Sequence, residues 1–200
     1  SIADKGYYYA PDPSSQSCCT IGGNVAENAG GAHCLKYGVT TNHILGLEVV
    51  LPNGEIIEIG KNGIPDSPGY DLLGLITGSE GTLGIVTKIT VRILKNPEAK
   101  QTVLAYFDKT ADGSQAVSDI ISAGIVPAAL EMMDKVAIEG VEAAAFPVGH
   151  PRDIEAVLLI EVDGISAGID EQITQILEVC THWNVREVKV ARNEAERARW

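Results

Sequence analysis

The sequence predicts an α+β fold in two parts, and three observations lead to that prediction. An Asn-Gly pair at 53–54 separates two apolar segments, which is the strongest short-range signal for a β-hairpin. Two glycine-rich stretches, 20–31 and 78–86, are each flanked by apolar strand-like sequence. Beyond residue 97, strands alternate with amphipathic helices, as in a ferredoxin-like half-domain. We therefore expect two structural units that meet near residues 95–100.

The first unit should open with an extended entry, because Pro11 and Pro13 restrict both themselves and the residues before them. Four glycines in residues 20–31 are poor material for a strand or a helix interior, so a loop is expected there. Asp71 would lie in the first turn of a short helix, where negative charge is favoured. The expected elements are a loop at 20–31, strands at 44–51 and 55–59, a loop at 61–69, a helix at 70–76, a glycine loop at 78–86 and a strand at 85–94.

The second unit follows from a change of periodicity after Leu94. Its expected strands are 102–107, 128–132, 156–162 and 185–190, and its expected helices are 113–123, 134–145 and 169–183. Near the end, Arg186, Arg192, Arg197 and Arg199 alternate with Glu187, Glu194 and Glu196. This pattern indicates a solvated helix face with i,i+3 or i,i+4 ion pairs.

Composition excludes several classes of function. The 200 residues carry a net charge of −12, which argues against a nucleic-acid-binding surface. No stretch approaches the ~18 apolar residues of a membrane span, and no signal peptide opens the chain. Cys18, Cys19, Cys34 and Cys180 fit neither a disulfide framework nor a metal site. A cytoplasmic protein is expected.

The two glycine stretches are the candidate ligand loops. Without Cβ atoms the backbone can approach a ligand closely, and successive N–H groups can surround an anion. We expect the two stretches to converge on one ligand, although a flexible surface loop explains either of them alone. The spacing in 78–84 is G-x-x-G-x-x-G, and neither G-x-G-x-x-G nor G-K-[ST] occurs, so the common nucleotide fingerprints are absent.

Three segments carry a resemblance to a known family: PDPSSQSCCTIGGNVAENAGG, KYGVTTNHILGLEVVLPNGEII and GYDLLGLITGSEGTLGIVTKITVRIL. They resemble the FAD-binding domain of the vanillyl-alcohol oxidase family, which is called PCMH-type. Within it they are similar to the branch of glycolate oxidase, D-lactate dehydrogenase and D-2-hydroxyglutarate dehydrogenase. A weaker similarity continues through ALEMMD to ARNEAERARW. The resemblance implies the C-terminal portion of an FAD-binding domain at 1–97 and an incomplete FAD-linked oxidase cap domain, partly ferredoxin-like, at 98–200.

The resemblance also implies non-covalent FAD as the cofactor and names the residues that would line it. The glycines and their neighbours would approach the flavin or its pyrophosphate by main chain, and Ile85 would meet the adenine side. The implied residues are Pro13, Ser15, Ser17, Cys19, Thr20, Ile21, Gly22, Gly23, Asn24, Gly30, Gly78, Ser79, Glu80, Gly81, Gly84 and Ile85. For Glu80, a carboxylate that accepts hydrogen bonds from nearby N–H groups is preferred to a catalytic role.

The histidines have no metal-site spacing, and no metal is expected. His33 could face the flavin, but the resemblance does not place a covalent attachment there. His43 is expected to be structural, and Cys34 to be a buried, inert thiol. No catalytic residue is assigned.

The implied activity is FAD-dependent oxidation of a small D-2-hydroxy acid, glycolate or D-lactate, to the 2-oxo acid. The implied partners are that substrate and other glycolate oxidase subunits, with no nucleic acid. Attachment to the inner membrane through those subunits is the implied alternative to a purely cytoplasmic location. One alternative is another family member, of the D-2-hydroxyglutarate dehydrogenase or alkyl-glycerone-phosphate synthase type. The other is a folded module that binds no cofactor.

Both ends of the sequence look cut. The family's other pyrophosphate loop would precede Ser1, and its substrate arginine and histidine motif would follow Trp200. We therefore expect the chain alone to be inactive and to bind FAD weakly.

Overall fold

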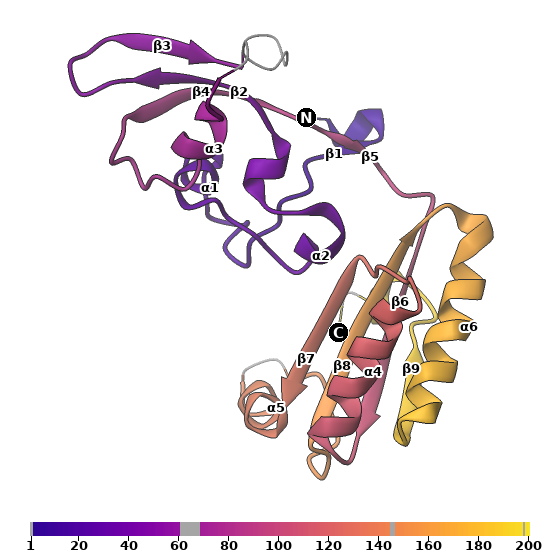
Figure 1. Cartoon of the computed structure of the whole chain (residues 1–200). Helices are drawn as coiled ribbons and strands as arrows, with labels where there is room; N and C mark the ends of the chain where they lie inside the picture. The colour runs from indigo at the N-terminus through magenta and orange to yellow at the C-terminus, as the bar shows by residue number, and fades with distance from the viewer. Residues whose placement is uncertain (1, 61–68, 145–146, 198) are drawn as a thin grey trace. The chain divides into compact units, whose positions relative to one another are not determined.

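The computed structural model describes residues 2–60, 69–144, 147–197 and 199–200. The chain divides into two compact units, Ser1–Asn96 and Pro97–Trp200 (Figure 1). Among the described residues, every helix is too short or too polar to span a bilayer. The predicted loop at 61–69 lies outside the described residues except for Gly69, as does the last residue of the predicted helix at 134–145.

A three-stranded antiparallel sheet forms the centre of the first unit. Its strands are β2 (Ile44–Val50), β3 (Ile56–Ile59) and β4 (Ile85–Val91), in the order β3-β2-β4. The predicted hairpin at 53–54 is confirmed. The backbone N–H of Leu51 donates to the carbonyl of Glu55 at 2.8 Å, and Gly54 has a φ of 83°, which suits glycine.

Short helices complete the first unit. The core joins Val25 of α1 (Ile21–Glu27) and Ile76 of α3 (Leu72–Ile76) to sheet residues such as Leu47 and Val49. Ile44 and Ile59 of the sheet complete this core of six side chains. Each of the six is at most 6% exposed, so their burial stabilises the packing of the helices on the sheet. The remaining elements are η1 (Ala3–Lys5), β1 (Tyr7–Tyr8), α2 (Cys34–Tyr37), η2 (Thr40–His43) and β5 (Leu94–Lys95).

Three predictions for the first unit were wrong. The stretch at 20–31 is mainly the helix α1, because Thr20 caps its start and Asn28, with a φ of 49°, ends it. The predicted strand at 85–94 stops at Val91, and β5 then pairs with β1 in a separate two-stranded sheet. Asp71 is also not in the first turn of its helix: it is the N-cap, and its carboxylate accepts the N–H of Gly74 at 2.9 Å.

The second unit is a four-stranded antiparallel sheet in the order β7-β8-β6-β9. This order with two crossing helices is the ferredoxin-like arrangement, so the α+β prediction is confirmed. The elements are β6 (Ala99–Phe107), α4 (Thr110–Ser122), β7 (Ala129–Asp134), α5 (Lys135–Glu142), β8 (Ala156–Gly164), α6 (Ser166–His182), β9 (Val185–Val190) and α7 (Glu194–Arg197).

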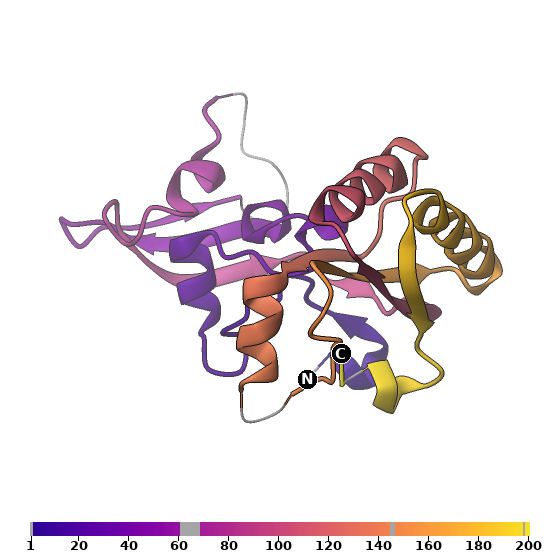
Figure 2. The same cartoon turned by 90° about the horizontal axis from the view of Figure 1, so that it is seen from below.

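Strand alternation divides the second unit into two layers. Val103, Ala105 and Phe107 of β6 face the main core, which α4 and α6 cover. Leu104 and Tyr106 face the other side, where they pack with Ile138 of α5. Figure 2 shows α4 and α6 on one side of this sheet and α5 on the other. The period-2 pattern of the strand therefore explains both layers.

Candidate cofactor-binding site

The N-terminus of α1 brings the first group of predicted site residues together. The Thr20 hydroxyl accepts the N–H of Gly23 at 3.0 Å, and the Thr20 carbonyl accepts the N–H of Asn24 at 3.0 Å. The N–H groups of Ile21 and Gly22 precede the first intrahelical hydrogen bond and are therefore open to a ligand. A Cβ at Gly22 would meet only the Thr20 hydroxyl, at 4.0 Å. Such a helix start suits an anion such as a phosphate.

The segment before α1 is a compact turn. The carbonyl of Ser15 accepts the N–H groups of Cys18 and Cys19, at 2.9 and 2.8 Å, and the carbonyl of Pro13 accepts that of Gln16 at 2.7 Å. These main-chain bonds leave the exposed hydroxyls of Ser15 and Ser17 near the start of the helix. The structure therefore places the predicted residues 13–24 in one continuous feature.

The second glycine stretch lies against the other end of α1. The N–H of Gly78 donates to the carbonyl of Val25 at 2.7 Å, and the N–H of Glu80 donates to that of Ala26 at 2.9 Å. The prediction that the two stretches lie together is confirmed. However, these two donors cap α1 and are not free to bind a phosphate.

Glu80 holds its loop differently from the prediction. Its backbone adopts a φ of 52°, unusual for a residue with a side chain, and its main-chain N–H makes the contact to α1. Among the described residues, its carboxylate makes no hydrogen bond, so the preferred role for the carboxylate was wrong. Gly78 and Gly81, with φ of 83° and 72°, supply the other left-handed turns of this loop.

Two of the predicted glycines are needed for packing within the chain. A Cβ at Gly84 would lie 2.7 Å from Cγ1 of Val49, and one at Gly30 would lie 2.9 Å from Sγ of Cys34. At these two positions the glycine backbone therefore lies close to other residues of this chain.

An Asp-His pair that the sequence did not indicate holds the entry segment in place. Nδ1 of His33 lies 2.5 Å from Oδ2 of Asp12, and a Cβ at Gly31 would lie 2.3 Å from the carbonyl oxygen of Asp12. Asp12 and His33 are 21 positions apart. No local spacing rule detects such a pair.

The remaining candidates have structural environments. His43 is 2% exposed and its Nε2 donates to the carbonyl of Tyr37 at 2.8 Å, in agreement with a structural role. Cys34 is only half-buried, and its sulfur accepts the N–H of Gly31 at 2.9 Å. The predicted charged helix face was partly wrong, because Arg186 lies on β9 and contacts Asp108 and Asp153. Among the residues described in this segment, Arg197 and Glu194 form the one i,i+3 ion pair, at 3.3 Å.

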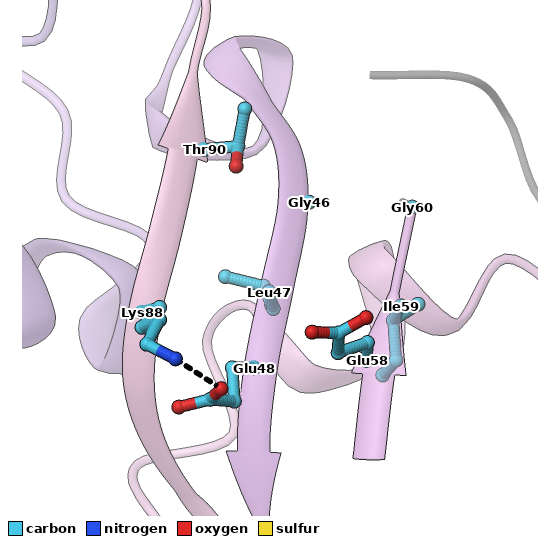
Figure 3. A pocket seen from close by; sticks show the side chains of 8 residues that line it. All are labelled: Gly46, Leu47, Glu48, Glu58, Ile59, Gly60, Lys88 and Thr90. Carbon is cyan, nitrogen blue, oxygen red and sulfur yellow. Dashed lines mark hydrogen bonds and ion pairs between the residues drawn. The ribbon is translucent and has the colours of Figure 1, made fainter. Parts of the chain in front are cut away.

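A shallow pocket of about 170 Å³ lies on the β3-β2-β4 sheet, as Figure 3 shows. Nζ of Lys88 lies 2.6 Å from Oε2 of Glu48. The second carboxylate oxygen of Glu48, Oε1, accepts a hydrogen bond from the Thr87 hydroxyl at 2.8 Å. The hydrogen bond from Lys88 lowers the pKa of Glu48, and the same bond raises the pKa of Lys88. Both side chains therefore stay charged near neutral pH and form a surface ion pair. The predicted site residues do not line this pocket.

The residues around α1 fit FAD in part. The open N–H groups of Ile21 and Gly22 suit a pyrophosphate oxygen, and the Ile21 and Ile85 side chains, 46% and 61% exposed, suit an aromatic ring. These features allow one side of a dinucleotide to be bound.

Comparison with known proteins identifies both units. Residues 1–60 match the family described as FAD binding domain, and residues 96–200 match FAD linked oxidases, C-terminal domain. The chain is 46% identical over 200 residues to glycolate oxidase subunit GlcD of Escherichia coli, covering 100% of the chain and 40% of that protein. It is 41% identical over 157 residues to D-lactate dehydrogenase of Archaeoglobus fulgidus, covering 78% of the chain and 34% of that protein.

A solved structure has the same fold. An alkyldihydroxyacetonephosphate synthase matches with a TM-score of 0.81 and 20% identity, over 99% of this chain and 40% of that one. The chain thus spans 34–40% of the length of the relatives named here. The comparisons confirm the resemblance that the glycine stretches indicated.

Proposed function

The chain belongs to the FAD-linked oxidases, because its residues 96–200 match their C-terminal domain, and on this basis we propose that it is part of an FAD-dependent enzyme that oxidises a small D-2-hydroxy acid. Bound FAD would supply the hydride acceptor for that oxidation. The start of α1 supports this proposal most directly, because it offers two free N–H groups beside an exposed apolar side chain.

The substrate class is inferred from the relatives. Glycolate oxidase and D-lactate dehydrogenase both act on 2-hydroxy acids, and the chain is 46% and 41% identical to the examples above. Glycolate is our first choice, because that match covers the whole chain. D-lactate is the second. The word subunit in the first relative's name suggests partner subunits for this protein as well, through which it could be held at a membrane.

We assign different roles to the two parts of the chain. Residues 1–97 would form one side of the FAD site, and residues 98–200 would form part of the cap domain. Within the first part, the sixteen residues from Pro13 to Ile85 named above remain our proposed cofactor contacts. Ile21 and Gly22, at the start of α1, are the strongest candidates, since their N–H donors have no partner among the residues that the structure describes.

The decisive experiment compares FAD binding by the chain and by Gly22→Ala. An added methyl meets only the Thr20 hydroxyl, at 4.0 Å, so the variant should fold as well as the parent. If a pyrophosphate approaches this backbone, the methyl displaces one charge-assisted hydrogen bond. FAD should then bind about ten- to a hundredfold more weakly, measured by quenching of flavin fluorescence.

Gly140→Ala is the matched control. A Cβ at Gly140 meets nothing within 4 Å, and this residue lies on α5 of the second unit, whereas all proposed contacts belong to the first unit. It should leave FAD affinity unchanged. Equal affinities of the parent and Gly22→Ala would show that the start of α1 does not bind the cofactor.

A further inference from the structure

A small cavity in the second unit has the features of an anion site. It has a volume of about 200 Å³ and lies between the start of β6 and the segment that follows β9. Two hydrogen bonds fix its walls: the N–H of Ala191 donates to the carbonyl of Thr102 at 2.9 Å, and Nε2 of Gln101 donates to the carbonyl of Ala191 at 2.6 Å. The cavity is too small for a dinucleotide but admits an ion of a few heavy atoms.

The charges around this cavity are positive in a chain whose net charge is −12. Lys100, Arg192 and Arg197 line it together with one carboxylate, Glu194. Nζ of Lys100 is 3.4 Å from Glu161, and Arg197 is 3.3 Å from Glu194, so these two cations are already neutralised. In the part of the chain that the structure describes, the Arg192 side chain makes no ion pair.

A buried hydroxyl in the same lining also has no partner. Thr102 is 2% exposed, and its Oγ1 makes no hydrogen bond to any residue that the structure describes. A buried polar atom without a partner is uncommon in native proteins and costs stability, so it marks a position where a ligand oxygen could bind. Oδ1 of Asn193 accepts the N–H of Glu196 at 2.9 Å, which leaves the Asn193 NH₂ group as a further donor.

We propose that this cavity binds a small oxyanion, with Arg192 as its charge partner and the Thr102 hydroxyl as its buried donor. Phosphate and small carboxylates share the required chemistry, since both offer negatively charged oxygen acceptors. One unpaired arginine supports only weak binding, with a Kd on the order of 1 mM. The FAD proposal does not depend on this site.

The test is an NMR titration of the ¹⁵N-labelled chain with inorganic phosphate at constant ionic strength. The amide signals of residues 191–193 should shift along a saturating curve. A parallel titration with glycolate distinguishes a phosphate site from a carboxylate site, because the better ligand saturates at lower concentration. Linear shifts with both anions, or no shifts, would overturn the proposal.

Three variants test the assigned residues. Arg192→Gln should weaken binding about tenfold or more, because it removes the charge-assisted hydrogen bond. Arg152→Gln, an exposed arginine that does not line this cavity, should leave binding unchanged. Thr102→Val removes the hydroxyl at similar volume, so it should weaken binding without destabilising the phosphate-free chain.

The variants also define how the proposal could be wrong. If Arg152→Gln weakens binding as much as Arg192→Gln does, the effect is general charge screening rather than a site. If Thr102→Val binds phosphate as well as the parent, the buried hydroxyl is not part of the site.

Discussion

Replacing Gly84 with alanine tests whether this glycine is needed for packing of the first unit. The added Cβ would lie 2.7 Å from Cγ1 of Val49 and 2.9 Å from the carbonyl oxygen of Val50. Val49 is fully buried in the core, and the second neighbour is backbone, so neither can move away cheaply. Overpacking of this kind costs about 1–3 kcal/mol. We expect the free energy of unfolding of the first unit to fall by that amount.

Urea denaturation can assign the loss to one unit. Both tryptophans, Trp183 and Trp200, lie in the second unit, whereas five of the six tyrosines lie in the first. Gly84→Ala should lower the midpoint seen by tyrosine near-UV circular dichroism and leave the tryptophan fluorescence transition unchanged. A loss below about 0.5 kcal/mol, the size of a neutral surface change, would refute the packing argument.

Gly81 provides a control with a different physical cause. A Cβ there meets only Cδ1 of Ile85, at 3.9 Å, but the residue has a φ of 72°. Gly81→Ala should therefore lose stability through backbone strain, by about 1–2 kcal/mol, and Gly81→Asn should lose less because asparagine tolerates this conformation. At Gly84, asparagine should be worse than alanine, because there the cost comes from volume.

Three further predictions concern the second unit and the thiols. Gly140→Ala should raise the stability reported by tryptophan fluorescence by up to about 1 kcal/mol, since it adds a methyl in open space within α5, and a lower midpoint would contradict this. Burial lowers the pKa of His150 below its ordinary value of 6.5, with Lys189 lowering it further and Glu142 opposing, so the unfolded chain binds a proton first. The free energy of unfolding should then fall as the pH decreases through 6.5. If a His150→Gln variant shows the same dependence of unfolding free energy on pH, that dependence does not come from His150. Burial raises the pKa of the Cys180 thiol to about 11, so maleimide should label exposed Cys18 quickly and Cys180 only on unfolding, as peptide mapping can check.

Local signals in the sequence were sufficient for the hairpin and for the second unit. The Asn-Gly turn at 53–54 and the strand–helix alternation after residue 97 depend on neighbours a few positions apart. The order β7-β8-β6-β9 then follows from a fold that packs both helices on one face.

The features that were missed depend on contacts far apart in the sequence. The stretch at 20–31 is helical because its C-terminal carbonyls receive N–H groups from Gly78 and Glu80, more than fifty positions later, in addition to its own Thr20 cap. The Asp12–His33 pair and the cavity around Arg192 likewise join segments that no periodicity connects. For the candidate site, the sequence indicated the glycine-rich segment that would approach the cofactor. It did not indicate which of the segment's N–H groups are left without a hydrogen-bond partner among the described residues.

The attachment of α1 at both ends makes its exchange kinetics informative. A seven-residue helix has too few turns for its two ends to open independently, so it closes and opens as one unit. The amide protons of Gly78 and Glu80 are held by its last carbonyls and exchange with solvent only when that unit opens. Any ligand that binds at Ile21 and Gly22 stabilises the closed state, so deuterium uptake at Gly78 and Glu80 slows in proportion to occupancy. These two amides report, from one end of the helix, on what is bound at the other.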